Sequence, residues 1–170
     1  MATVLTRWSG MLWIAMTLVA CDEPPGARAS KDLPLPERVG GRFVTDQLAM
    51  AGKDLFLWSD GGGCQLQESV KGRQQGDARW LKPTAPCYFI KSPGTERVQV
   101  YQHDKNTRVV AVVGTPVPDQ KPGGRCGTDV QGLIFNAAGS VRLSENTRSG
   151  SAYCAEQGLD NLEYSLFMTQ

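Results

Sequence analysis

The sequence predicts a small, mainly β domain, built as an antiparallel sheet, sandwich or barrel, with an α+β domain as the alternative. From residue 54 onward, short runs of alternating or β-branched residues are separated by Gly, Pro, Asn and Asp, which is typical of strands joined by turns. The same region contains four cysteines, an even number that fits two disulfides in an exported protein. With 170 residues, 41% of them hydrophobic, the chain can form one core, and we expect a single domain over residues 38–170.

Seven segments have the length and pattern of strands. They are residues 54–58, 64–67, 87–91, 97–103, 107–114, 130–136 and 141–144. Two hairpins are expected to join neighbouring strands, through residues 104–106 and 137–139. The segment 107–114 is apolar at every position from Val109 to Val113. We therefore expect it to be a central strand with both faces covered.

Helical patterns are short and lie near the two ends of this region. Asp160 followed by Glu163 has the spacing of a capping box, which predicts a short C-terminal helix. The apolar residues expected on one side of this helix are Leu159, Leu162, Leu166 and Phe167. A final strand over residues 163–169 is the alternative, because apolar residues also alternate there. A second short helix is expected over residues 45–51.

The four domain cysteines allow three disulfide pairings. We favour Cys64 with Cys87 and Cys126 with Cys154, because each pair closes a loop of about two dozen residues, worth about 3 kcal/mol in the chain-entropy treatment. Zinc is the competing use of four cysteines, but no C-x-x-C spacing occurs and the sole histidine, His103, has no partner at ligand spacing. We therefore expect no metal site.

The N-terminus has the layout of a secretory signal. One basic residue, Arg7, precedes an apolar stretch over residues 8–20. This stretch is roughly 13 residues long, whereas a membrane-spanning helix needs about 20. We therefore expect residues 1–20 to be a removable export signal rather than a permanent anchor.

The end of this signal resembles the bacterial lipobox. The motif is Leu18-Val19-Ala20-Cys21, in which small residues precede a cysteine. The resemblance implies that Cys21 receives diacylglycerol and becomes the first residue of a lipoprotein held at the membrane by its lipid. An ordinary secretory signal with an incidental cysteine is the alternative.

Residues 21–37 are expected to form a tether between the lipid and the domain. The segment contains four prolines and few residues that could be buried. Proline-rich chain extends by about 3.1 Å per residue, so it could place the domain about 50 Å from the lipid surface. Asp22 resembles the inner-membrane retention signal of enteric bacteria, but this rule varies among bacteria. The sequence therefore predicts a periplasm-facing position and leaves the inner and outer membranes as alternatives.

Charge and motifs narrow the range of functions. Without Arg7, 17 basic and 17 acidic residues remain, which argues against a nucleic-acid partner because phosphate binding needs clustered positive charge. No G-x-S-x-G motif occurs, and the glycines at 61–63 are not followed by the lysine of a phosphate loop. His103 is adjacent to Asp104, which indicates a solvated hairpin tip. We therefore expect no catalytic residue, no cofactor and no enzymatic activity.

Two places are candidates for contact with a partner protein. Residues 115–125 form a long loop rich in proline and glycine, and its charged residues Asp119, Lys121 and Arg125 are candidate contacts. Trp80 follows a polar segment inside the expected loop between the first two domain cysteines, where it could anchor an interface. Core packing is the alternative role for this tryptophan.

These observations predict a membrane-anchored binding module. Its general character is similar to that of envelope lipoproteins that inhibit lysozyme-like enzymes or confer immunity to toxins. A cell-wall hydrolase or a toxin is therefore the expected partner. A structural accessory lipoprotein of a secretion or conjugation apparatus is the alternative, because its tether and domain would look the same.

Overall fold

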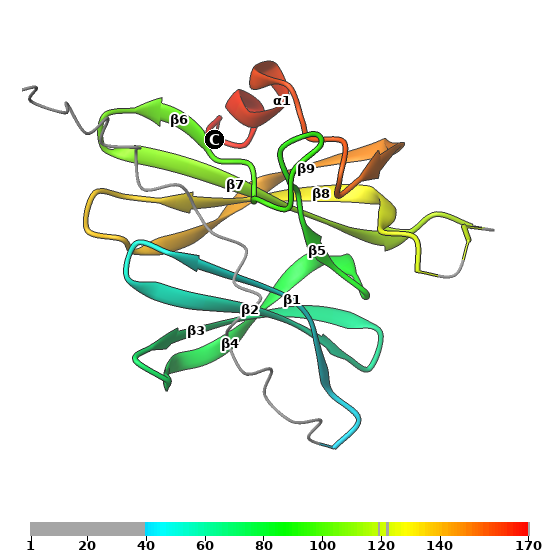
Figure 1. Cartoon of the computed structure of the whole chain (residues 1–170), viewed down its shortest axis with the longest axis horizontal. Helices are drawn as coiled ribbons and strands as arrows, with labels where there is room; N and C mark the ends of the chain where they lie inside the picture. The colour runs from blue at the N-terminus through cyan, green and yellow to red at the C-terminus, as the bar shows by residue number, and fades with distance from the viewer. Residues whose placement is uncertain (1–39, 119, 122, 170) are drawn as a thin grey trace, which may run out of the picture.

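The computed structural model describes residues 40–118, 120–121 and 123–169, which form two antiparallel sheets and one short helix (Figure 1). The first sheet contains β1 (Phe43–Met50), β2 (Lys53–Asp60), β3 (Gly63–Val70) and β4 (Arg73–Thr84). The second contains β5 (Tyr88–Phe89), β6 (Tyr101–Asp104), β7 (Thr107–Pro116), β8 (Cys126–Phe135) and β9 (Val141–Cys154), followed by helix α1 (Asn161–Leu166). The predicted mainly β domain is confirmed. Residues 1–20 and 21–37 lie outside the described residues, and no helix within the described ranges is long and apolar enough to cross a membrane.

The first sheet is a meander in the order β1-β2-β3-β4. Each of its three hairpins turns through two residues with positive φ, namely Ala51-Gly52, Gly61-Gly62 and Lys71-Gly72. Positive φ at both central positions matches the right-handed twist of the flanking strands, which makes such two-residue turns favourable in hairpins. The glycines before Cys64 therefore form the turn between β2 and β3.

The second sheet has the order β5-β7-β8-β9, and β6 also pairs with β7. The prediction of a central strand is confirmed, because the side chains of β7 from Val109 to Val113 are at most 1% exposed. The expected hairpin between residues 97–103 and β7 is only partly correct. Within residues 97–103, only the part from Tyr101 onward, in β6, pairs with β7, whereas the backbone nitrogen of Gln99 donates to the backbone oxygen of Ile90.

The sheets pack in layers around two apolar clusters. Between the sheets, Leu55 and Leu66 of the first sheet share a cluster with Val110 and Leu133 of the second. On the opposite face of the second sheet, another cluster includes residues of β7 and β8 and the helix residue Tyr164. Figure 1 accordingly shows α1 lying over the second sheet, away from the first.

Two segments that were not predicted as strands from the sequence are strands in the structure. The helix expected over residues 45–51 is wrong, because this segment belongs to β1 and buries Leu48 and Met50 at alternate positions. The polar segment before Trp80 is not a loop but the first half of β4, with residues 73–77 exposed along the edge of the sheet. Backbone pairing with β3 holds this segment in the sheet, although its sequence lacks alternating apolar residues.

The C-terminal helix is confirmed, and the alternative strand is wrong. Asp160 and Glu163 form the predicted capping box. The expected apolar side is only partly correct, because Leu162 is 69% exposed and Tyr164 is buried instead. The ring of Tyr164 stacks on Tyr101 with centroids 5.5 Å apart, and this contact fixes which side of the helix faces the sheet.

Both favoured disulfides are confirmed. Cys64 of β3 is bonded to Cys87, which directly precedes β5, so this bond joins the two sheets. Cys126 and Cys154 are directly paired residues at the ends of β8 and β9. The first bond is fully buried, whereas the second is partly exposed.

Candidate functional site

The loop that follows β7 projects from one end of the second sheet, on the right of Figure 1. Its base is held by a backbone hydrogen bond from Val117 to Cys126 (3.4 Å) and by the disulfide of Cys126. The side chain of Gln120 accepts a further bond from the Cys126 backbone (3.1 Å). The loop is therefore tied to the rigid sheet at its foot.

The charged residues expected in this loop have different surroundings. Lys121 is exposed. The Arg125 guanidinium lies 5.1 Å from the centroid of the Tyr88 ring and 3.9 Å from a Glu156 carboxylate oxygen, so it fastens the loop to β5 and to the segment after β9. Asp119 lies outside the described residues. Lys121 is thus available to a partner, whereas Arg125 has a structural role.

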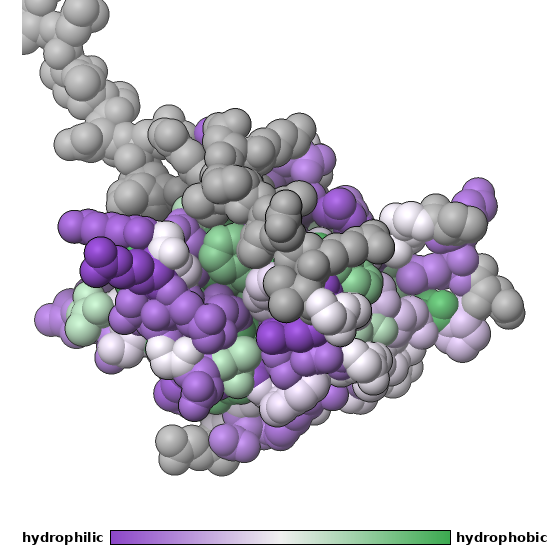
Figure 2. Space-filling view, turned by 90° about the horizontal axis from the view of Figure 1, so that it is seen from below, coloured by the Kyte–Doolittle hydropathy of each residue, from purple (hydrophilic) through white to green (hydrophobic). Residues whose placement is uncertain are grey.

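Trp80 does not belong to the core, because 58% of it is exposed. It lies on β4 of the first sheet, on a different sheet from the projecting loop. Figure 2 views the molecule from below, the side on which Figure 1 places the first sheet, and shows hydrophilic residues interrupted by smaller hydrophobic areas. Trp80 and the loop are therefore two separate candidate surfaces.

A row of side chains on the outer face of the first sheet includes Trp80. Trp58 of β2 is directly opposite Gln65 of β3, which is directly opposite Trp80. Directly opposite residues of paired strands project from the same face. The sequence did not reveal this row, because β4 lacks the alternation of a strand and cross-strand register cannot be read from a single segment.

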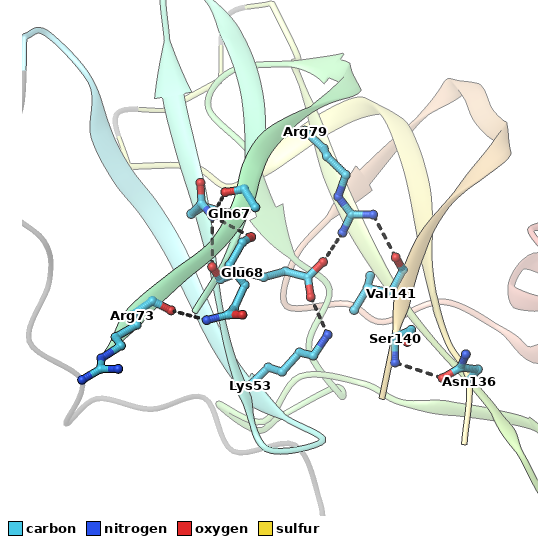
Figure 3. Close-up of polar contacts among 10 residues, drawn as sticks. Lys53, Gln67, Glu68, Arg73, Arg79, Asn136, Ser140 and Val141 are labelled. Atoms are coloured by element: carbon cyan, nitrogen blue, oxygen red, sulfur yellow. Dashed lines mark hydrogen bonds and ion pairs between the residues drawn. The ribbon is translucent and has the colours of Figure 1, made fainter. Parts of the chain in front are cut away.

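A partly buried network links the two sheets near the other end of β3. Glu68 accepts from Lys53 Nζ (2.7 Å) and from Arg79 Nη2 (2.5 Å), and Figure 3 shows its carboxylate between these two cations. Arg79 also donates to the backbone oxygen of Val141 in β9 (2.8 Å). Because every charge in the group is paired, the arrangement fixes the sheets relative to each other.

Asp46 is a second inter-sheet carboxylate. Its oxygens accept from the backbone nitrogens of Gln47 and Phe89, both at 2.9 Å, which connects β1 to β5. Burial raises the pKa of Asp46, although these hydrogen bonds and the nearby Arg125 and Lys91 act in the opposite direction. The charged form therefore destabilises the fold relative to the neutral form.

We expect Asp46→Asn to change how stability depends on pH. A raised folded-state pKa contributes stability below the unfolded pKa of 3.8 and loses it as pH rises through the folded pKa. Because asparagine does not titrate, the stability of the wild type relative to this variant should fall as pH rises from about 4 through the raised pKa of Asp46. Urea unfolding at several pH values measures this difference.

Asp104→Asn provides a control with the opposite sign. Asp104 is exposed, and the backbone hydrogen bond from Asn106 is the main cause that lowers its pKa. Its contribution is therefore present at neutral pH and is lost on acidification. Parallel stability curves for the wild type and Asp46→Asn would contradict the assignment of Asp46.

His103 lies where the sequence placed it. It is exposed at the end of β6, beside Asp104 and next to the turn into β7. Its ring centroid is 6.3 Å from that of Tyr101. The prediction of a solvated hairpin tip is therefore confirmed.

A cavity of about 210 Å³ lies at the end of the second sheet. Its lining includes Ile134, Arg142 and Met168. The site is shallow, and its lining combines the cationic side chain of Arg142 with apolar side chains. Neither the projecting loop nor the Trp80 row contributes to it.

Comparisons with known proteins add no relative. No protein-family model, no curated protein and no solved structure matches this chain.

Proposed function

We propose that this chain is a lipid-anchored binding module of the bacterial cell envelope that blocks a partner protein, such as a cell-wall hydrolase or a toxin. The observation that carries the proposal is the loop after β7, which projects from the second sheet on a base closed by the Cys126–Cys154 disulfide. A loop held in this way can enter a cleft with little loss of backbone freedom. Its action is steric and requires no chemistry from this chain.

The N-terminal segment supports the envelope location. The motif that ends in Cys21 resembles a lipobox, and the proline-rich residues 21–37 follow it directly. Acyl chains on Cys21 would retain the module at the membrane, and the tether would allow it to reach about 50 Å from the lipid. Two disulfides fit an oxidising compartment.

The position of Lys121 suggests how the loop binds. Lys121 is exposed within the projecting segment, whereas Arg125 is engaged with Tyr88 and Glu156 at its foot. The lysine can therefore meet a carboxylate of the partner. A hydrolase cleft lined by catalytic carboxylates would provide such a group.

Deletion of residues 118–124 should abolish partner binding while leaving the melting temperature nearly unchanged. The deleted segment lies in the projecting loop, and none of its described residues belongs to either apolar cluster. Partners are first captured from envelope and secreted fractions with the tagged protein. The affinity of the purified partner is then measured for the wild type and the deletion by calorimetry.

Lys121→Ala and Lys105→Ala form a matched pair for this experiment. Both lysines are exposed, but Lys105 lies in the turn between β6 and β7. We expect weaker binding only for Lys121→Ala. Unchanged affinity after the loop deletion would remove the loop from the binding surface, and capture of a large membrane complex instead of a soluble enzyme would favour an accessory role in a secretion or conjugation apparatus.

A further inference from the structure

The outer face of the first sheet carries a structured group of aromatic and planar polar side chains. Val44, Trp58, Gln65 and Trp80 are directly opposite one another across β1, β2, β3 and β4. Neighbouring strands lie about 4.8 Å apart, so the two tryptophans are separated by about 10 Å at their backbones. We call Arg42, Trp58, Asp60, Gln65 and Trp80 the indole face.

Trp80 is held in place from beneath. Its six-membered ring lies so close to Gly63 that a Cβ at this position would be 2.5 Å from a ring carbon. Gly63 therefore provides a seat for the ring, and any larger residue there would displace it. Because more than half of Trp80 is exposed, the seated indole presents apolar surface to the solvent.

Planar polar groups lie beside the other tryptophan of this face, Trp58. The Arg42 guanidinium lies 5.0 Å from the centroid of the Trp58 ring, and its Nε is 3.2 Å from a carboxylate oxygen of Asp60. Its Nη2 donates to Gln65 Oε1 at 2.6 Å. These contacts fix the Gln65 amide between the two indoles.

The Gln65 amide retains a free donor. Only 7% of this residue is exposed, and within the described residues its Nε2 donates no hydrogen bond. Its Nε2 is not among the fully enclosed, unpaired side-chain atoms of the described residues, so a ligand acceptor can reach it. Asp60 Oδ1 and Oδ2 add acceptors at the same edge of the face.

We propose that the indole face binds a glycan of β-linked pyranose rings. A pyranose has an apolar face of C–H groups, which can stack on Trp80, and a rim of hydroxyl groups, which both donate and accept. Gln65 would donate to such a hydroxyl, and Asp60 would accept from one. Because the Arg42 guanidinium lies over the Trp58 ring, Trp80 provides the open stacking surface, and Gln65 and Asp60 provide polar groups on the same face.

A protein partner fits this face less well. A stable protein interface buries about 800 Å² on each side around a fully buried apolar core. Only three large hydrophobic side chains are exposed in the described part of the chain: Phe43, Trp80 and Leu162. Leu162 lies on α1, which covers the opposite face of the second sheet, so Phe43 is the only one of the other two on the same sheet as Trp80.

That a glycan polymer lies within reach of this face rests on the proposed envelope location. The described part of the chain begins at Gly40, two residues before Arg42 of the indole face. The preceding residues 21–37 can extend about 50 Å from the lipid surface. A glycan polymer located above the membrane therefore lies within the range of the module.

Calorimetry with defined oligosaccharides tests the proposal. The probe is the β-1,4-linked hexamer of N-acetylglucosamine, with the corresponding hexamer of glucose as comparator. The full chain is purified from membranes in a detergent without a sugar headgroup. We expect saturable binding of at least one hexamer and roughly tenfold weaker binding by Trp80→Ala.

Leu162→Ala is the matched control, because it removes an exposed hydrophobic side chain from another surface and should bind as the wild type does. Trp80→Phe retains a ring over Gly63 and should bind with intermediate affinity, which separates loss of stacking from loss of fold. Absence of saturable binding by the wild type, or equal binding by Trp80→Ala, would overturn the proposal. A captured protein whose affinity depends on Trp80 while neither hexamer binds would also overturn it.

Discussion

Replacing Cys21 with serine is expected to abolish incorporation of labelled fatty acid and to release or mislocalise the protein. A serine hydroxyl lacks the thiolate nucleophilicity that makes cysteine the acceptor of the lipid. Each buried methylene of an acyl chain contributes about 0.8 kcal/mol to anchoring, so loss of the chains removes most of the membrane affinity. Labelling with palmitate and fractionation of membranes measure both effects.

The double variant Cys126→Ser/Cys154→Ser is a suitable control, because it removes two cysteines that form a disulfide within the domain. We expect it to remain acylated and bound to the membrane. Cys21→Ser itself should leave thermal unfolding unchanged. A Cys21→Ser protein that still carries acyl chains would show that the lipid is attached elsewhere.

Replacing Cys64 and Cys87 together by alanine should lower the free energy of unfolding by about 3–5 kcal/mol. The bond closes 23 residues, and both cysteines are fully buried between the sheets. Its removal therefore frees the unfolded chain and also leaves a gap in the core. Urea unfolding monitored by circular dichroism measures the loss.

The pair Cys126→Ala/Cys154→Ala tests whether burial contributes to this effect. This bond spans 28 residues, so its loop-closure term is nearly the same, at about 3 kcal/mol. Because both cysteines are only partly buried, their removal leaves a smaller gap. We expect a smaller loss than for the inter-sheet bond, and an equal or larger loss would show that packing around Cys64 and Cys87 adds little.

The sequence predicted the projecting loop, but it did not predict which of the charged loop residues is exposed and which is engaged with other side chains. Proline and glycine between two strands indicated an exposed loop over residues 115–125. From the sequence alone, Lys121 and Arg125 were equal candidates for contact with a partner. Only the fold brings Tyr88 and Glu156 to Arg125, because these residues are distant in the chain.

The sequence did not predict the indole face, because it did not predict that β1 and β4 are strands. A polar edge strand such as β4 has no buried side to impose alternation over its first half, so its sequence resembles a loop. In β1, the alternation of Leu48 and Met50 is too short to exclude a helix. Without both strands, the first sheet and its outer face could not be assembled.

The sequence by itself predicted the mainly β class and the central strand β7. It also indicated the capping box and a favoured pairing of the four domain cysteines, with a final strand and the other pairings left as alternatives. These features depend on local patterns of hydrophobicity, capping and spacing. Tertiary structure alone decided that Trp80 is exposed beside Gln65, that Tyr164 rather than Leu162 is buried, and that Asp46 joins the two sheets. The physical reason is that strand register and layer packing depend on contacts between residues far apart in the chain, and no single segment contains that information.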